Sequence, residues 1–232
     1  MDYKKTYEIF KFMCDENLNM RVENILNIFT ETAMLEDREF IFQHDNLMWV
    51  LYGWDLEIFD YPLCGDRVEV STQYLGAEKF FAYRNFYLNG KSGKLARAKS
   101  LWLVIDKDKG ELLRIPKKSC DNDLAKCKGD LFDRKKKIAG GTYASKSSFR
   151  VLKRDLDFNQ HMNNANTLSY IMDALDFKAK RIEIVYKKQI FLYEKFSLAI
   201  SENDKWADFK ILGSSPDDIR SFGRIYKWEE KR

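Results

Sequence analysis

The chain carries the same short polar segment twice, each time directly before an apolar stretch with helical spacing. Asp157 aligns with Asp15 at an offset of 142 residues (157 minus 15). The same offset superposes three further identities, Lys11 with Lys153, Asn17 with Asn159 and Met20 with Met162, and pairs Tyr7 with Phe149. Self-similarity at a fixed spacing indicates a repeated structural unit. The sequence therefore predicts two copies of one fold in tandem.

Each copy reads as one helix followed by several strands. In the first copy, apolar residues recur at helical spacing from Val22 to Leu35, and in the second the helix is expected over roughly 163–175. β-branched and aromatic residues dominate the segments that follow, which are separated by turn signals. The expected strands are 47–59, 67–75, 79–88 and 95–105 in the first copy, and 182–192, 196–200, 205–212 and 220–228 in the second. The predicted fold class is α+β.

A charged segment separates the copies. Residues 117–137 contain eight Lys or Arg and four Asp, a surplus equal to the net charge of +4 of the whole chain. We expect an N-terminal unit at 1–116, a basic linker at 117–145 and a C-terminal unit at 146–232. Two interpretations stay open: a solvated linker, or a basic surface for an acidic partner that ends in Arg134, Lys135, Lys136 and Lys137.

Composition excludes several classes of protein. A net charge of +4 is too small to indicate a nucleic-acid binder, and no apolar run approaches the roughly 20 residues of a membrane span. The first ten residues, MDYKKTYEIF, lack the apolar stretch of a signal peptide, so a cytoplasmic protein is expected. Cys14, Cys64, Cys120 and Cys127 form no CxxC pair, which argues against structural zinc and favours reduced thiols.

The two copies differ at one chemically important position. Where the first has Asn19, the second has His161, a group whose ordinary pKa near 6.5 suits a general base. In an extended approach, alternate residues Asp157, Asn159 and His161 point to one side and converge. A helix that starts at about Asn163 and Asn164 offers free N–H groups to a developing oxyanion. We interpret this string as a candidate catalytic site.

A simpler interpretation of the string is a helix cap. Asp and Asn are preferred before helices, and a packed His161 would then have no chemical role. Capping explains one or two of these polar groups but not five. The other histidine, His44, lies in an apparent loop without converging partners and is expected at the surface.

Several stretches of the chain resemble the acyl-acyl carrier protein thioesterases of plants and bacteria, which are built from two hot-dog units in tandem. DFNQHMNN matches the family signature DxNxHxNN, and IVYKKQI follows downstream. In the first half, the resemblance covers WVLYGWDLEIFDYPLCGDRVEVST and RNFYLNGKSGKLARAKSLWLVIDKDKGELLRIP. The resemblance implies that an antiparallel sheet wraps a long helix in each unit. It also implies that the first unit buries an acyl chain and that the second carries the catalytic string.

By position, the resemblance assigns Asp157, Asn159 and His161 to the polar catalytic residues of that family. A further family residue, Glu or Cys, follows a tyrosine-basic-basic stretch, which places Gln189 at the Glu position and Ile190 at the Cys position. Neither side chain can act as a nucleophile or a carboxylate base, so Gln189 can only position water or the thioester by hydrogen bonding. The nearest carboxylates, Glu183 and Glu194, fit the spacing poorly.

The expected activity is hydrolysis of fatty acyl-acyl carrier protein to free fatty acid. His161 would take a proton from water, Asn159 would hold the water or the carbonyl oxygen, and Asp157 would orient the site. The acyl chain would lie in an apolar tunnel lined by residues around Trp49, Trp54 and Trp102, although core packing is the simpler role for most of these rings. No metal or organic cofactor is implied.

Two other functions stay open: an acyl-coenzyme A thioesterase, or a protein that binds acyl carriers or fatty acids without turnover. A monomer and a homodimer are both compatible with two units in one chain.

Overall fold

The computed structural model describes residues 3–40, 46–115, 124 and 131–228. The chain divides into two compact units, Met1–Arg134 (unit 1) and Lys135–Arg232 (unit 2). The division falls within the segment 117–145 that the sequence predicts as a linker. In the part of the chain that the structure describes, no helix is long and apolar enough to cross a membrane.

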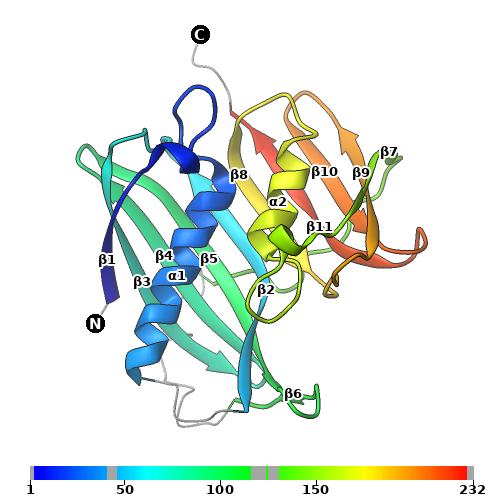
Figure 1. Cartoon of the computed structure of the whole chain (residues 1–232), viewed down its shortest axis with the longest axis horizontal. Helices are drawn as coiled ribbons and strands as arrows, with labels where there is room; N and C mark the ends of the chain where they lie inside the picture. The colour runs from blue at the N-terminus through cyan, green and yellow to red at the C-terminus, as the bar shows by residue number, and fades with distance from the viewer. Residues whose placement is uncertain (1–2, 41–45, 116–123, 125–130, 229–232) are drawn as a thin grey trace. The chain divides into compact units, whose positions relative to one another are not determined.

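Unit 1 is an antiparallel sheet with one long helix on its face (Figure 1). The sheet order is β1-β3-β4-β5-β2, and the short β6 pairs with β5. The elements in chain order are β1 (Tyr3–Glu8), the 3-10 helix η1 (Lys11–Met13), α1 (Val22–Phe40), β2 (Leu47–Ile58), β3 (Arg67–Glu78), β4 (Phe81–Gly90), β5 (Gly93–Asp106) and β6 (Leu112–Leu113).

Unit 2 repeats this arrangement with a shorter helix. Its sheet order is β8-β11-β10-β9-β7, so the strand before the 3-10 helix again pairs at one edge of the sheet. The elements are β7 (Ala144–Arg150), the 3-10 helix η4 (Lys153–Asp155), α2 (Asn164–Met172), β8 (Ala179–Tyr186), β9 (Lys195–Glu202), β10 (Trp206–Leu212) and β11 (Ile219–Lys227). The predicted duplication is therefore confirmed: both units run strand, 3-10 helix, helix and four antiparallel strands.

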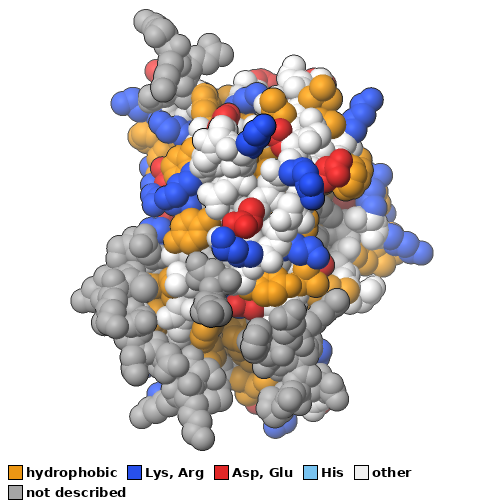
Figure 2. Space-filling view, turned by 90° about the vertical axis from the view of Figure 1, so that its left-hand side faces the viewer, with side chains coloured by type: hydrophobic (Ala, Val, Ile, Leu, Met, Phe, Trp, Pro, Cys, Tyr) orange, Lys and Arg blue, Asp and Glu red, His pale blue; other side chains and the backbone are white. Residues whose placement is uncertain are grey.

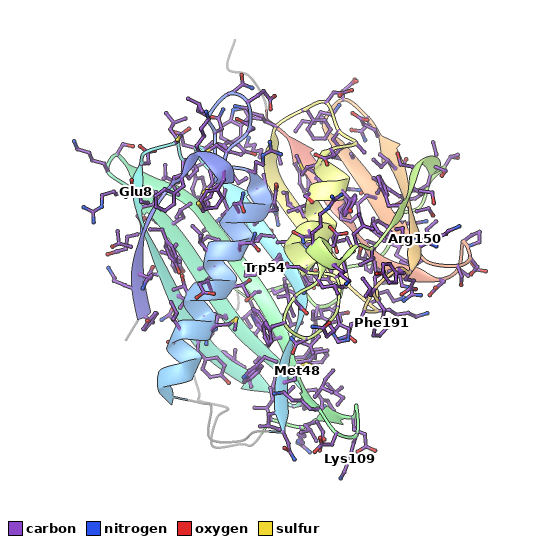
Figure 3. The ribbon with its side chains drawn as sticks, in the orientation of Figure 1. Glu8, Met48, Trp54, Lys109, Arg150 and Phe191 are labelled. Atoms are coloured by element: carbon purple, nitrogen blue, oxygen red, sulfur yellow. The ribbon has the colours of Figure 1, made fainter. Side chains whose placement is uncertain are left out.

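The apolar face of α1 forms the core of unit 1. Ile25, Leu26 and Phe29 are fully buried, and the Phe29 ring stacks on Phe86 of β4 with centroids 5.1 Å apart. Trp54 of β2, labelled in Figure 3, lies 5.1 Å from Phe86. Burying each such side chain contributes about 1.5–3 kcal/mol of transfer free energy. Aromatic packing thus fixes how α1 lies on its sheet.

One ion pair lies inside unit 1. The Arg84 guanidinium on β4 donates to the carboxylate of Glu36 on α1, and both side chains are mostly buried. Arg84 also donates to the hydroxyl of Thr72, at 3.0 Å. Buried charges are tolerated when they are paired and hydrogen-bonded, as they are here.

The helix of unit 2 is shorter than the sequence predicts. α2 ends at Met172, and the N–H groups of Ala174 and Leu175 turn back to carbonyls three residues earlier. Such bonds tighten and close the last turn of a helix. Asp173 and Asp176 follow, and negative charge is unfavourable at the end of the helix dipole where carbonyl oxygens point. These acidic residues explain why the helix ends before the apolar pattern does.

Candidate active site

The loop before α2 is a tight turn and not the extended approach that the sequence predicts. The N–H of Asp157 donates to the carbonyl of His161 at 2.8 Å, and Gln160 has a φ of +64°. Alternate residues of this segment do not point to one side, because side chains alternate only along a strand. The argument for convergence by alternation is therefore wrong, and the loop positions these residues by its own hydrogen bonds.

The carboxylate of Asp157 holds the turn closed. Its Oδ1 accepts the N–H of Asn159 at 2.8 Å and the N–H of His161 at 3.2 Å. A hydrogen bond to a charged group contributes about 1.5–3 kcal/mol. Asp157 thus fixes the backbone of both residues, and these two hydrogen bonds are the ones that its carboxylate accepts within the described residues.

Unit 1 contains the same turn without a histidine. Asp15 Oδ1 accepts the N–H groups of Asn17 and Asn19, each at 2.9 Å. The N–H of Asp15 donates to the carbonyl of Asn19 at 2.8 Å, and Leu18 has a φ of +62°. The backbone therefore closes equally well with Asn or His at this position, so folding of the turn does not require His161.

The imidazole of His161 packs against one aromatic ring. Phe191 meets it edge-on, with ring centroids 5.0 Å apart, and the two residues form an isolated β-bridge. His161 is half-buried, and neither ring nitrogen has a hydrogen-bond partner among the residues that the structure describes. Both nitrogens are thus available to a water molecule or to a substrate.

The start of α2 does not leave the N–H of Asn163 free. Asn163 caps the helix: its side chain accepts the N–H of Ala165 at 2.8 Å, and its own N–H donates to Asp155 at 2.8 Å. The prediction of a free N–H at Asn163 is therefore wrong. The N–H groups of Asn164 and Asn166 have no acceptor within the described residues, and that of Asn164 lies at the first position of the helix.

A partly buried tyrosine holds this helix start, a contact that the sequence analysis missed. The hydroxyl of Tyr186, at the end of β8, donates to the carbonyl of Asn164 at 2.9 Å. Burial raises the pKa of Tyr186 far above its usual value, so its hydroxyl stays a donor. Tyr186 was noted only as part of the tyrosine-basic-basic stretch, since the sequence does not show which carbonyl it reaches.

Gln189 lies beyond the strand on which the resemblance placed it. β8 ends at Tyr186, and the N–H groups of Lys187 and Lys188 both bond the carbonyl of Arg220. The Gln189 carbonyl accepts from the Arg220 guanidinium at 2.7 Å. Because Met162 N–H donates to the carbonyl of Ile190 at 2.8 Å, Gln189 sits close to the start of α2.

Arg220 organises the segment that contains Gln189 and Phe191. It also pairs with Glu194 and with Asp218, and Glu194 in turn accepts the N–H of Phe191 at 3.0 Å. Glu183 pairs with Lys136 and Arg181. Both carboxylates that fit the catalytic spacing poorly are thus occupied by ion pairs, and no sequence signal marked Arg220 as the partner of Glu194.

The predicted acyl-binding tryptophans lie in unit 1 and differ in burial. Trp54 is 1% exposed and belongs to the aromatic core. Trp49 and Trp102 are partly buried and pack on a small apolar cluster that includes Ala77, Val104 and Ile115. Trp54 is thus a core residue, which agrees with core packing as the simpler role for these rings.

The predicted basic surface is largely paired. Arg134 forms an ion pair with Glu78 at 3.0 Å and lies over the ring of Phe81. Lys136 pairs with Glu183 at 2.6 Å and is mostly buried. On the face drawn in Figure 2, the described Lys and Arg side chains lie among Asp, Glu and apolar side chains.

Two of the four cysteines lie within the described residues. His44, Cys120 and Cys127 lie outside the described residues. Cys14 is buried, which raises the pKa of its thiol, and Cys64 is partly buried. Within the described ranges, no three His, Cys, Asp or Glu side chains gather as metal ligands would.

Sequence comparisons match both units to one family. A family profile described as the N-terminal domain of acyl-ACP thioesterases matches residues 1–122, and the C-terminal domain profile matches residues 141–212. Oleoyl-acyl carrier protein thioesterase 1, chloroplastic, of Arabidopsis thaliana is 22% identical over 199 residues, which are 75% of this chain and 55% of the relative. The chain spans about half the length of the curated relatives it matches.

Solved structures share the fold over nearly the whole chain. An acyl-ACP thioesterase from Bacteroides thetaiotaomicron superposes with a TM-score of 0.82 at 17% identity, covering 96% of each chain. The 12:0-ACP thioesterase from Umbellularia californica has a TM-score of 0.78 at 15% identity and covers 99% of this chain and 94% of its own. The predicted fold, two hot-dog units in tandem, is confirmed by these neighbours. With both domain profiles matched in order, the chain belongs to the acyl-ACP thioesterase family.

Proposed function

We propose that the protein hydrolyses the thioester of a fatty acyl-acyl carrier protein and releases the free fatty acid. One observation carries the assignment of the site: the same turn is built twice, and only the copy in unit 2 has a histidine that the turn does not need. A titratable group with no folding task and two unpaired ring nitrogens is suited to proton transfer. The family supports the reaction class.

In the proposed reaction, a ring nitrogen of neutral His161 accepts a proton from water as the oxygen attacks the thioester carbonyl carbon. The charge that develops on the carbonyl oxygen is met by the N–H of Asn164 at the start of α2. The tetrahedral intermediate then collapses, the carbon–sulfur bond breaks, and the protonated imidazole returns its proton to the thiolate. The step needs only water and a base, so no cofactor enters it.

The other residues position these two groups. Asp157 acts through the backbone: it holds the N–H groups of Asn159 and His161. The amide side chain of Asn159 orients the water, and that of Gln189 orients the thioester. Ile190 is buried and has no nucleophilic atom, so water attacks directly and no acyl-enzyme forms.

The acyl chain is bound by apolar side chains of unit 1, among which Trp49 is the predicted contact. The carrier is bound by cations, for which the sequence predicts Arg134, Lys135, Lys136 and Lys137. A cytoplasmic location and a monomeric or homodimeric state also stay predictions.

The test is thiol release from acyl-acyl carrier proteins and matching acyl-coenzyme A esters, with wild type and His161→Ala compared. We expect the carrier-protein ester to be preferred and the rate to fall by roughly 10²-fold or more in the variant. A preference for the coenzyme A ester would instead favour an acyl-coenzyme A thioesterase. Wild-type protein that binds the esters without release would overturn hydrolysis and favour a binding protein. An acyl group found on the protein by mass spectrometry after quenching would contradict direct attack by water.

A further inference from the structure

A set of exposed cations and apolar side chains lies on the segments of unit 2 that are next to His161 in sequence or joined to it through backbone pairing. We call this set the rim. It consists of four cations, Arg150, Lys153, Lys187 and Lys195, and four apolar residues, Leu152, Phe158, Phe191 and Tyr193, all of which are exposed. Arg150 and Phe191 are labelled in Figure 3.

Backbone pairing joins the main segments of the rim. Arg150 of β7 lies opposite Lys195 of β9 in the sheet register. The N–H of Tyr193 donates to the carbonyl of Val151 at 2.9 Å, which ties the turn before β9 to the segment before η4. The bridge between His161 and Phe191 joins this turn to the candidate active site. The rim therefore borders the proposed reacting group directly.

The cations of the rim have no ion-pair partner among the described residues, whereas the neighbouring carboxylates already accept hydrogen bonds or form ion pairs. Within the described residues, none of the four cations has an ion-pair partner. Asp155 is buried and accepts from the Leu152 N–H and the Tyr170 hydroxyl, and Glu194 is held by Arg220. Asp157 is used by the turn. The accessible charge of the rim is therefore positive, and it attracts an acidic partner.

The aromatic side chains of the rim have no role in the core. Phe158 is 72% exposed and Tyr193 is 54% exposed. Tyr193 also has a φ of +64°, a backbone conformation that costs energy for any side chain. Exposed aromatic rings among cations are typical of a protein-binding surface.

Unit 1 shows that the turn does not need this tyrosine. Gly65 occupies the equivalent position: its N–H donates to the carbonyl of Ile9, as Tyr193 donates to Val151, and its φ is +89°. Glycine adopts this conformation without strain. Unit 2 thus keeps an aromatic ring, exposed and strained, where glycine satisfies the fold. A ligand that contacts the ring explains why it is there.

The rim fits a carrier better than the linker cations do. Arg134 and Lys136 already pair with Glu78 and Glu183, and Lys136 is mostly buried. We infer that the rim, and not the segment Arg134–Lys137, is the docking surface for the protein carrier of the acyl group. This inference rests on the proposed function. The carrier would present an acidic face with apolar side chains and would deliver the thioester to His161.

A protein suits the rim better than a free nucleotide does. Nucleotide phosphates are commonly bound by several free N–H groups at a helix start or a glycine-rich loop. At the start of α2, the N–H groups of Asn163 and Ala165 are already bonded. Exposed cations spread over four segments and mixed with aromatic rings instead match a protein interface.

Charge reversal in the rim tests the inference. In Lys153→Glu/Lys195→Glu we expect kcat/KM for the carrier-protein ester to fall at least tenfold, while kcat/KM for the matching coenzyme A ester changes less than twofold. Raising the salt concentration should slow the wild type on the carrier-protein ester and affect the variant much less. Tyr193→Gly should lower carrier activity alone, through KM, and leave thermal stability unchanged or higher.

Two further variants serve as controls. Lys91→Glu/Lys109→Glu reverses two exposed lysines of unit 1 and should leave both activities unchanged. Lys135→Glu/Lys137→Glu tests the linker: a carrier-specific loss there, without one in the rim variant, would overturn the inference. An equal loss on both esters in the rim variant would overturn it as well.

The inference and the proposed function can fail separately. If the wild type releases no thiol from either ester, binding of the acyl-acyl carrier protein is measured directly by titration. Binding that weakens at least tenfold in the rim variant still supports the docking surface. Binding that is equal in both proteins refutes it.

Discussion

His161 occupies in unit 2 the backbone position that Asn19 occupies in unit 1, and each donates its N–H to the carboxylate four residues earlier. The protein therefore contains its own control for the candidate base. The turn in unit 1 shows that the fold forms without a histidine, and the turn in unit 2 carries the imidazole in addition.

The first prediction concerns replacement of His161 by asparagine, the residue that unit 1 has at the equivalent position. His161→Asn should leave the free energy of unfolding within about 0.5 kcal/mol of wild type, because Asn already fits this turn. Thiol release should fall by roughly 10²-fold, because the base is lost. Thermal unfolding and an ester assay measure the two effects. The matched variant Asn19→His should change neither, and a loss of activity there would show that the two turns are not separable.

Removal of the carboxylates should separate folding from activity. Asp157→Ala and Asp15→Ala each leave two backbone N–H groups without their acceptor, so each should cost about 1–3 kcal/mol in the free energy of unfolding. Only Asp157→Ala should lower kcat, because only its turn holds His161. Urea titrations with rate measurements would check this pair, and equal loss of kcat in both variants would argue against the assignment.

Tyr186→Phe should act on the helix start. The variant removes the donor to the Asn164 carbonyl and should cost about 1–2 kcal/mol, since that carbonyl is left with one partner fewer. We expect kcat to fall while KM for the ester stays close to wild type, because Asn164 N–H meets charge only in the transition state. A variant with altered KM and unchanged kcat would place Tyr186 in substrate binding instead.

Breaking the ion pair inside unit 1 should be costly. Arg84→Met leaves Glu36 buried without its cation, and such a loss costs about 3–5 kcal/mol. Adding Glu36→Gln should recover part of this loss, because no charge is then left buried. Denaturant unfolding of the four members of this cycle measures the coupling, and additive effects would mean that the two groups do not interact.

Stability should fall in acid in part through Asp218. The hydrogen bond from Lys188 lowers the pKa of this carboxyl group below its usual value, with help from Ser214 and Arg220. A group with a lowered pKa in the folded state stabilises it above the unfolded pKa, near 3.9, and that contribution is lost as the pH falls through the folded value. Asp218→Asn should therefore show a shallower loss of stability below about pH 4 in thermal unfolding. An unchanged slope would contradict the assignment.

The repeat, the helices and the inner strands were predictable because apolar residues recur in them at helical or strand spacing. α1 begins at Val22, as predicted, and β3 begins at Arg67. The edge strands β1 and β7 were not predicted, because YKKTYE and ASKSSFR are mostly polar and contain no run of alternating apolar residues. Such strands form only because a neighbouring strand supplies their hydrogen bonds, and a local pattern does not show that partner.

The candidate site was found for a partly incorrect reason. The comparison of Asn19 with His161 was sound, but the expected extended approach is a turn, since Asp157 bonds the backbone and Gln160 adopts positive φ. A carboxylate that satisfies nearby N–H groups competes with extended structure, and the sequence alone does not show which arrangement wins. Arg220 was missed because Glu194 and Gln189, the partners through which it holds the site, are far from it in sequence.

The turn before each helix is closed by main-chain groups and by one aspartate. The side chain two places before the helix cap, that of Asn19 or His161, is therefore not required for the turn to fold. A position of that kind accepts new chemistry at little thermodynamic cost. Gene duplication followed by divergence at such a position gives a route by which a binding fold acquires a reactive group. For protein engineering, Asn19 is a position where other side chains can be substituted without redesigning the scaffold.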